Sequence, residues 1–157
     1  MSGFRRGVRL GIDVGKARVG VARCDPDGML AVPVETVQRS EQSLGRIAEI
    51  AAEYEPLEFV VGLPVNMQGA DTPSTADARE FAAALQRLTA VPVRMMDERL
   101  STVTAHAALR SSGRTQRNSR SIVDQVAAVV LLQHAIDTEK STGNPAGSVV
   151  PTDEEPT

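Results

Sequence analysis

The stretch RLGIDVGKARVGVARCD, residues 9–25, decides how this sequence begins to fold. Two short apolar runs, 10–14 and 19–22, have the length of β-strands, and the Gly-containing segment 15–18 between them is typical of a turn. An aspartate, Asp13, lies inside the first run, although a buried carboxylate costs several kcal/mol unless it is paired, hydrogen-bonded or metal-bound. The stretch therefore predicts a hairpin and also a carboxylate with a specific task.

The remaining elements follow from this hairpin outward. Residues 8–14, 18–25 and 29–37 read as three strands with short connections, which is typical of an antiparallel meander. Helical and strand patterns then alternate, with strands at 57–64 and 91–98 and helices at 40–54, 74–88, 101–109 and 121–137. This order predicts an α/β fold with a mixed five-stranded sheet, an antiparallel meander followed by βαβ units, and helices on the faces of the sheet.

Two helix starts have candidate capping residues. Ser40 is the expected cap of the helix at 40–54, because a hydroxyl can accept a hydrogen bond from the first free amides. Ser74 and Asp77 have the spacing of a capping box for the next helix. Between residues 111 and 119 the chain is polar and basic, which predicts a loop.

Length and composition indicate one folded domain. The chain has 157 residues, of which 41% are hydrophobic and 24% charged. We expect the domain to span residues 1–138, followed by a disordered tail over 139–157, where Gly, Pro, Ser, Thr and acidic residues dominate. A single cysteine, Cys24, excludes an intramolecular disulfide and favours the reducing cytoplasm. No apolar run has the length of a signal peptide core or a membrane span.

The charge distribution is more informative than the formal net charge of −3. The expected tail is acidic, and the rest of the chain is neutral overall. Within that neutral part, a basic stripe without any acidic residue contains Arg99, Arg110, Arg114, Arg117 and Arg120. Such a stripe is able to contact phosphates, although a solvated arginine-rich surface explains the same charges.

Carboxylates occur at three further places where a surface role explains them poorly. Asp97 and Glu98 end the strand at 91–98, and Asp124 lies near the start of the apolar last helix. Functional sites of open α/β sheets collect at the carboxyl ends of the parallel strands, where these residues and Asp13 are able to meet. Converging carboxylates need a cation, and Mg²⁺ or Mn²⁺ suits an all-oxygen site. Two such ions can activate water for attack on a phosphodiester.

Each carboxylate also has a purely structural explanation. Ser121 and Asp124 have the spacing of a capping box. Asp97 and Glu98 are able to cap the following helix or to pair with nearby arginines. Asp13 could instead accept hydrogen bonds from the amides of the turn that follows it.

Two basic residues follow Asp13 in the sequence. Lys16 and Arg18 lie in or beside the predicted turn, from which they could approach a scissile phosphate, Arg18 in bidentate fashion. A solvent-exposed hairpin turn is the alternative. The two histidines and one cysteine are too few for a zinc site built from such ligands.

Four motifs together resemble one protein family. They are GIDVGKARVGVA (11–22), VVGLPVNMQG (60–69), DERLST (97–102) and SIVDQVAAVVLLQ (121–133). In this order they are similar to the YqgF family, also called RuvX, whose members are bacterial proteins related to Holliday-junction resolvases with an RNase H-like fold. The resemblance extends from about residue 8 to residue 136.

The resemblance implies a metal-dependent phosphodiesterase. By position, Asp13, Glu98 and Asp124 would be its catalytic metal ligands for Mg²⁺ or Mn²⁺, with Asp97 as the second choice for the DER motif. The substrate phosphates would be bound by basic residues, namely Lys16, Arg18, Arg99, Arg114, Arg117 and Arg120. Gly62, Pro64 and Gly69 match the loop of the family beside the site.

The family has two duties, which the catalytic residues do not distinguish. One is maturation of the 5′ end of pre-16S rRNA, which we expect here, and the other is resolution of four-way DNA junctions by a homodimer, because two strands must be cut in concert. A non-catalytic RNA-binding assembly factor is a further alternative. The first motif also resembles the phosphate-binding turn of actin-like ATPases, but those close two such domains around ATP.

Overall fold

The computed structural model describes residues 4–66, 68–97 and 116–150, with 116–124 as helical backbone. Its elements come in the order β1 (Arg9–Val14), β2 (Arg18–Cys24), β3 (Ala31–Gln38), α1 (Ser43–Tyr54), β4 (Glu58–Leu63), α2 (Pro73–Leu88), β5 (Val93–Asp97), α4 (Gln116–Thr142) and β6 (Ser148–Val149). The predicted α/β order is present. The helix expected at 101–109 lies outside the described residues.

The strands form one mixed sheet in the order β3-β2-β1-β4-β5-β6. The first three strands pair antiparallel, as the short turns between them predict. Strand β1 then pairs in parallel with β4, and β4 pairs in parallel with β5. Strand β1 is therefore central, with its carboxyl end at the same edge of the sheet as the carboxyl ends of β4 and β5.

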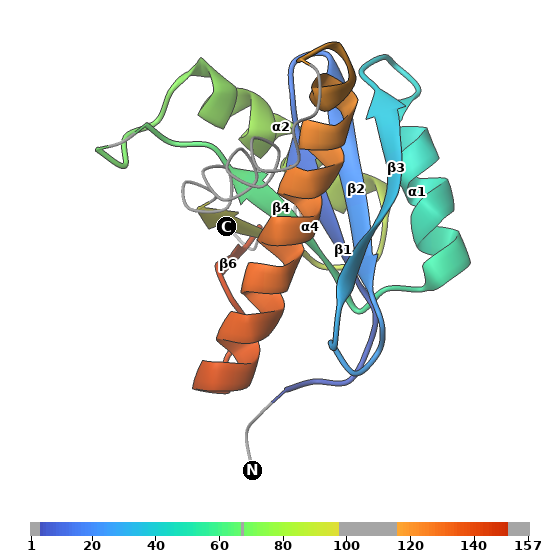
Figure 1. Cartoon of the computed structure of the whole chain (residues 1–157), viewed down its shortest axis with the longest axis vertical. Helices are drawn as coiled ribbons and strands as arrows, with labels where there is room; N and C mark the ends of the chain where they lie inside the picture. Colours follow the sequence, from blue (N-terminus) through green and yellow to red (C-terminus); the bar gives the residue numbers. More distant parts are fainter. Residues whose placement is uncertain (1–3, 67, 98–115, 151–157) are drawn as a thin grey trace, which may run out of the picture.

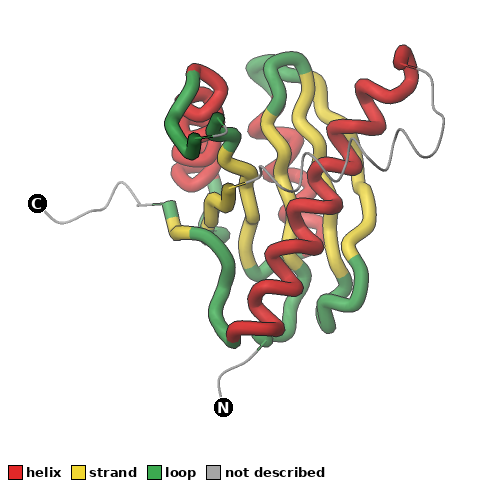
Figure 2. The backbone as a smooth tube through the Cα atoms, turned by 60° about the vertical axis from the view of Figure 1, so that its left-hand side comes forward, coloured by secondary structure: helices red, strands yellow, loops and turns green. Residues whose placement is uncertain are grey.

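Helices cover both faces of the sheet (Figures 1 and 2). Alternate residues of β1 face opposite sides of the sheet. Leu10 and Ile12 belong to a core cluster with residues of α1 and α2, such as Ile47 and Leu85. The second cluster joins the other face to α4 through residues that include Leu132. We call these the α1/α2 face and the α4 face.

Gly11 allows α4 to lie very close to the central strand. A Cβ atom at this position would stand 2.9 Å from the carbonyl oxygen of Ala128 and 2.9 Å from Cβ of Leu132. Contacts this short are sterically excluded, so only glycine fits here without a shift of the helix. The first residue of the GIDVG motif thus fixes how α4 packs on the sheet.

The sequence prediction of a disordered tail beginning at residue 139 is wrong for the part that the structure describes. Helix α4 continues to Thr142, and Ser148–Val149 pairs antiparallel with β5, giving the sheet six strands instead of the expected five. Ala146 and Val150 are buried in the two core clusters. A few apolar residues among many polar ones therefore suffice to attach this segment, which composition alone does not reveal.

Glu139 shows why the helix continues. It is 2% exposed and accepts hydrogen bonds from Nε of Arg5 at 2.9 Å and from Nη2 of Arg9 at 3.2 Å. Arg5 also pairs with Glu58, which in turn binds Arg94 at 3.1 Å. This buried charge cluster ties the N-terminal segment, β1, β4, β5 and the end of α4 together at the end of the sheet opposite the carboxyl ends of β1, β4 and β5.

The helix caps differ from the prediction. Thr72, with Pro73 after it, caps α2 through a capping box with Thr75, so the helix begins earlier than Ser74. Asp77 instead forms an ion pair with Arg39. Helix α1 begins after Gln42, whose own side chain makes no capping hydrogen bond, while Oγ of Ser40 accepts a hydrogen bond from the backbone N–H of Gln42 at 3.1 Å. A threonine two residues before Ser74 satisfies the same chemical rule, so the sequence alone could not decide between them.

Cys24 is fully buried, and its Sγ accepts a hydrogen bond from the backbone N–H of Arg9 at 3.3 Å. Burial raises the pKa of the thiol. Within the described part of the chain, no helix has the length and apolar character required to cross a membrane.

Candidate nuclease site

Asp13 lies on the α4 face of the sheet, near the carboxyl end of β1. It is partly buried there. Its register partner on β2 is Gly20, and the parallel pairing of Ile12 with Val61 places Gly62 beside it on β4. Glycine contributes no side chain, so the two strands that flank Asp13 add none next to its carboxylate on this face. The central strand therefore presents one carboxylate between two bare backbone positions.

Arg18 shares this face with Asp13. It is the first residue of β2, two positions before Gly20, and Val19 and Val21 of the same strand lie in the core of the α1/α2 face. Residues related in this diagonal way on neighbouring strands are within reach of a long side chain. The structure thus brings Arg18 and Asp13 to the same face of the sheet.

The turn between β1 and β2 is closed by a hydrogen bond from the backbone N–H of Gly15 to the carbonyl oxygen of Arg18 at 2.8 Å. Lys16 is exposed at its tip. Its positive charge is one of the causes that lower the pKa of the Asp77 carboxyl, after the hydrogen bond from Arg39, which is the largest. The charge of Lys16 thus acts on Asp77 of α2, while Arg18 lies on the α4 face of the sheet.

Helix α4 brings position 124 to the level of Asp13. Ala128 lies over Gly11, and position 124 is one helical turn earlier, a displacement of about 6 Å along the helix. The step from Gly11 to Asp13 along β1 covers nearly the same distance. The Nε2 amide of Gln125 donates to Oγ1 of Thr36 at 2.8 Å, and Thr36 is the register partner of Gly20. The backbone of Asp124 therefore lies along α4 at the level of Asp13.

The interpretation of Ser121 and Asp124 as a capping box does not hold. Helix α4 begins at Gln116, so both positions lie in the interior of the helix. Arg117 and Arg120, expected in or beside the basic loop, occupy the first turns of α4. Glu98, Arg99 and Arg114 lie outside the described residues.

Asp97 and Asp13 lie on opposite faces of the sheet. Val93 and Met95 of β5 belong to the α1/α2 face and Met96 to the α4 face, so strand alternation assigns Asp97 to the α1/α2 face. Asp97 is exposed at the end of β5.

The donor chemistry at Asp13 suits a hard divalent cation. A partly buried carboxylate has the oxygen donor that Mg²⁺ and Mn²⁺ prefer. Among the residues whose side chains the structure describes, no group of three His, Cys, Asp or Glu forms a metal site. Asp13 is the one member of the predicted catalytic triad whose side chain belongs to this described part of the chain.

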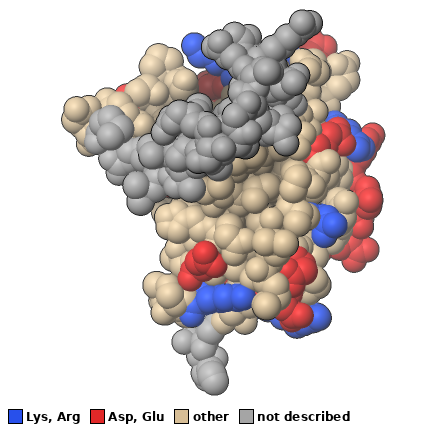
Figure 3. All heavy atoms as spheres, viewed as in Figure 1, with Lys and Arg blue, Asp and Glu red and all other residues tan. Residues whose placement is uncertain are grey.

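Charged side chains are scarce over the middle of α4. Between Gln125 and Ile136 the helix contains no Lys, Arg, Asp or Glu, and Figure 3 shows this area as largely uncharged. Acidic and basic side chains lie side by side over α1, where Arg46 pairs with Glu35 and Glu49. Among the basic residues whose side chains the structure describes, Arg18 lies on the face that carries Asp13.

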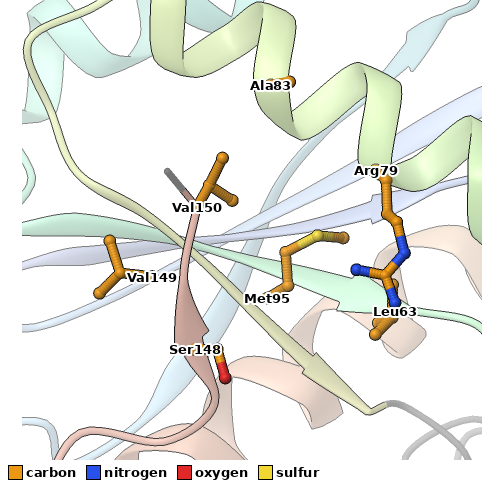
Figure 4. Close-up of a pocket in the computed structure, with 7 residues that line it drawn as sticks. All are labelled: Leu63, Arg79, Ala83, Met95, Ser148, Val149 and Val150. Atoms are coloured by element: carbon orange, nitrogen blue, oxygen red, sulfur yellow. The ribbon is translucent and has the colours of Figure 1, made fainter. Parts of the chain in front are cut away.

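A separate pocket lies on the α1/α2 face (Figure 4). It has a volume of about 500 Å³ and is lined by Leu63, Arg79, Ala83, Met95, Ser148, Val149 and Val150. The lining is mainly apolar, and Arg79, whose guanidinium is 3.6 Å from Asp71, supplies its charged group. The sheet separates this pocket from Asp13, so it is not part of the candidate nuclease site.

One feature of the site was not predicted from the sequence. Arg39, directly after β3, contacts the turn that carries Lys16 and Arg18, and its guanidinium is held by Asp77 of α2. The sequence contains no local signal for this contact, because its partners are 24 and 38 residues away.

Comparisons with known proteins agree with this architecture. A family described as "RuvX: Holliday junction resolvase" matches residues 7–138. A protein of Clavibacter michiganensis named "Putative pre-16S rRNA nuclease" is 52% identical, with 94% of each chain covered. A protein of the same name from Streptomyces coelicolor is 49% identical, covering 94% of this chain and 90% of the relative.

The same fold is found in solved structures. The structure "T. thermophilus RuvC in complex with Holliday junction substrate" superposes with a TM-score of 0.54 at 20% identity, covering 88% of this chain and 98% of that chain. The structure "Thermus thermophilus RuvC structure" gives a TM-score of 0.53 at 20% identity, covering 88% of this chain and 99% of that chain. The RNase H-like fold that the resemblance implies is therefore confirmed.

Proposed function

Since this chain belongs to the RuvX family, we propose that it is a divalent-metal-dependent nuclease that processes the 5′ end of pre-16S rRNA in the cytoplasm. The observation that carries the proposal is the position of Asp13. A partly buried carboxylate stands near the carboxyl end of the central strand, between two glycine positions and on the face that also carries Arg18. A structural role alone does not require this combination.

In the proposed site Asp13, Glu98 and Asp124 hold Mg²⁺ or Mn²⁺. When bound, the metal supplies activation of a water molecule and neutralises charge on the phosphodiester. Arg18 binds the non-bridging phosphate oxygens through its planar guanidinium and orients the phosphodiester beside Asp13. Lys16 adds an exposed positive charge that attracts the polyanion.

The packing of α4 supports the assignment of Asp124. Gly11 brings the helix close to β1, and the contact of Gln125 with Thr36 fixes the helix over the row of residues that contains Gly20 and Asp13. The backbone position of residue 124 at the level of Asp13 supports this assignment.

An end-labelled digest tests the proposal. A 5′-extended small-subunit rRNA fragment is incubated with the wild-type protein and Mn²⁺, beside Asp13→Asn. We expect the wild type to trim the extension and the variant to lose at least about 100-fold in rate, since removal of a single charged contributor costs several kcal/mol of transition-state stabilisation.

Asp27→Asn is the matched control for this digest. Asp27 pairs with Arg6 on the exposed hairpin between β2 and β3, where the side chains are 62% and 72% exposed. This variant makes the same chemical change away from the proposed site and should cleave like the wild type. Full activity of a folded Asp13→Asn protein would refute the assignment of Asp13.

A four-way DNA junction is the second candidate substrate. The description of the family and the likeness to RuvC favour it. A labelled junction in the same reaction distinguishes the two, because a resolvase introduces paired symmetric nicks and acts as a homodimer. Binding that weakens with salt, without cleavage in any divalent metal, would indicate a non-catalytic assembly factor.

A further inference from the structure

We propose that Arg39 is a positioning residue that holds the turn between β1 and β2, and with it Lys16 and Arg18, in the conformation that binds substrate phosphate. This inference rests on the proposed nuclease function, because the turn is assigned to phosphate binding there.

Arg39 holds the turn at two points. Its backbone N–H donates to the carbonyl oxygen of Ala17 at 2.9 Å, and its Nη1 donates to the carbonyl oxygen of Gly15 at 2.7 Å. These two carbonyls flank Lys16, and Gly15 also donates to the carbonyl of Arg18. A single residue from the end of β3 therefore fixes both sides of the turn.

The guanidinium of Arg39 is itself oriented by α2. Its Nη1 and Nη2 donate to the two carboxylate oxygens of Asp77 at 2.9 and 3.0 Å, a bidentate arrangement that restricts the plane of the group. The ring centroid of Phe81, one helical turn later, lies 5.3 Å from the guanidinium carbon. The hydrogen bond from Arg39 lowers the pKa of the Asp77 carboxyl, so the carboxylate stays charged at neutral pH.

The same arrangement links two loops at one edge of the sheet. Helix α2 begins with the capping box of Thr72 and Thr75, and Oγ1 of Thr75 donates to the carbonyl of Pro64, directly after β4. Arg39 thus connects the turn after β1 with the helix that also holds the segment after β4. Both segments lie at the carboxyl ends of the parallel strands, where the proposed site is located.

The ion pair is only partly shielded, with side chains 25% and 36% exposed, so its contribution to global stability is small. Its geometry has a more specific effect. The contacts restrain a short, basic, otherwise exposed turn, and restraint before binding lowers the entropy cost of ordering the turn around a phosphate. We therefore expect Arg39 to affect substrate affinity more than folding.

Two substitutions distinguish a positioning effect of the Arg39–Asp77 pair from a direct electrostatic effect on RNA binding. Asp77→Asn removes a negative charge beside Lys16, so electrostatics alone predicts tighter binding of RNA. Arg39→Gln removes a positive charge, so electrostatics alone predicts weaker binding. If the pair positions the turn, both substitutions must weaken binding, by about tenfold each.

Arg46 and Glu35 provide the matched control. They form a bidentate pair at 2.6 and 2.9 Å, with side chains 42% and 33% exposed, and they join α1 to β3 away from the turn. Arg46→Gln and Glu35→Gln make the same charge changes without touching the turn. Affinity for a 5′-extended rRNA fragment is measured by fluorescence anisotropy, together with KM and kcat.

We expect Arg39→Gln and Asp77→Asn to raise KM with little change in kcat. The two control variants should have the KM and kcat of the wild type. Opposite effects of Asp77→Asn and Arg39→Gln on affinity would overturn the proposal in favour of simple electrostatics. Arg39→Lys retains the charge without the planar fork and should behave like Arg39→Gln. Full recovery of affinity by Arg39→Lys would likewise contradict positioning.

Backbone amide exchange distinguishes this proposal from the proposed function. Exchange at residues 15–18 should accelerate in Arg39→Gln and Asp77→Asn, relative to the two control variants. Unchanged exchange at the turn would overturn the positioning role whatever the activity. If exchange accelerates in the variants but the wild-type protein neither binds nor cleaves nucleic acid, Arg39 still holds the turn in place. The nuclease function would then be refuted.

Discussion

Three glycines determine which atoms surround Asp13. Gly11 lies under α4, and Gly20 and Gly62 flank the carboxylate on the neighbouring strands. A larger side chain at the flanking positions would occupy space next to Asp13, and one at Gly11 would displace the helix. The motif around Asp13 therefore encodes access and helix packing in addition to the charge.

Gly11→Ala tests the close contact with α4. The added Cβ would meet backbone and side-chain atoms at 2.9 Å, so we expect a loss of about 1–3 kcal/mol in the free energy of unfolding and a fall in cleavage rate. Gly45→Ala is the control, because nothing lies within 4 Å of a Cβ there. Since Gly45 lies within helix α1, this change should stabilise the protein by about 0.5–1 kcal/mol in urea denaturation.

At the scale of the elements, α4 is held at both ends of its contact with the sheet. Gln125 binds Thr36 near the site, and Glu139 enters the buried charge cluster at the other end. Position 124 depends on both contacts, since a helix that slides or rotates would change the place of every residue along it. The charge cluster far from Asp13 is therefore expected to influence catalysis through the position of α4.

Glu139→Gln tests this connection. Removing the Glu139 charge leaves Arg5 and Arg9 with Glu58 as their remaining carboxylate, which should lower the free energy of unfolding by about 3–5 kcal/mol. Glu49→Gln, at a side chain that is 71% exposed, should have almost no effect. A chemical denaturation curve for Glu139→Gln that coincides with the wild-type curve would contradict the structural importance of the cluster.

The same residue predicts a dependence on pH. Burial raises the Glu139 pKa, but the hydrogen bonds of Arg5 and the charges of Arg9 and Arg5 outweigh it and lower the pKa from 4.5 to about 2. The carboxylate therefore stabilises the fold fully above its ordinary pKa, and this contribution is lost as the pH falls toward 2. Between these values, unfolding free energies of Glu139→Gln should decline less steeply than those of the wild type.

Secondary structure was largely predictable because the periodicity of β1 to β5, α1 and α2 agrees with their local packing. The capping of α2 was not, since Thr72 and Ser74 satisfy the same rule and tertiary contacts decide between them. The Asp77–Arg39 pair was also missed, because sequence patterns describe neighbours within a turn or two. Asp13 was proposed as a site residue because it lies in an apolar strand, whereas the glycines beside it could be recognised only from the strand register.

At the scale of the whole molecule, the C-terminal segment belongs to the folded domain as far as residue 150. Ala146 and Val150 enter different core clusters, so the segment crosses the edge of the sheet from one face to the other. The composition of this segment suggested disorder, because averages over many polar residues conceal two buried ones. The edge of β5 is thereby covered instead of exposed.

Substitution of two adjacent valines tests the attachment of this segment. Val150 is 8% exposed and Val149 is 53% exposed. We expect Val150→Ala to lower the free energy of unfolding by about 2 kcal/mol, and Val149→Ala to change it by less than about 0.5 kcal/mol, as measured by thermal and urea denaturation. Equal effects of the two changes would show that Val150 is not packed in the core.

Metal binding should stabilise the whole domain if the proposed ligands are correct. With free Mn²⁺ at about 100 times its dissociation constant, the native state gains about 2.7 kcal/mol by mass action. The wild-type protein should therefore melt at a higher temperature in Mn²⁺ than in EDTA, and Asp13→Asn should lose most of this difference. An equal shift in both proteins would place the metal elsewhere.

The native thiol of Cys24 can be used to measure how often the packing around it opens. Its thiol is fully buried, hydrogen-bonded to Arg9 and raised in pKa, so a thiol reagent reacts only when the packing between the N-terminal segment, β2 and α4 opens. The rate of labelling in native buffer thus measures the frequency of that opening without any engineered probe. A cysteine introduced at an exposed position can be labelled selectively in the folded protein, while the native thiol stays protected.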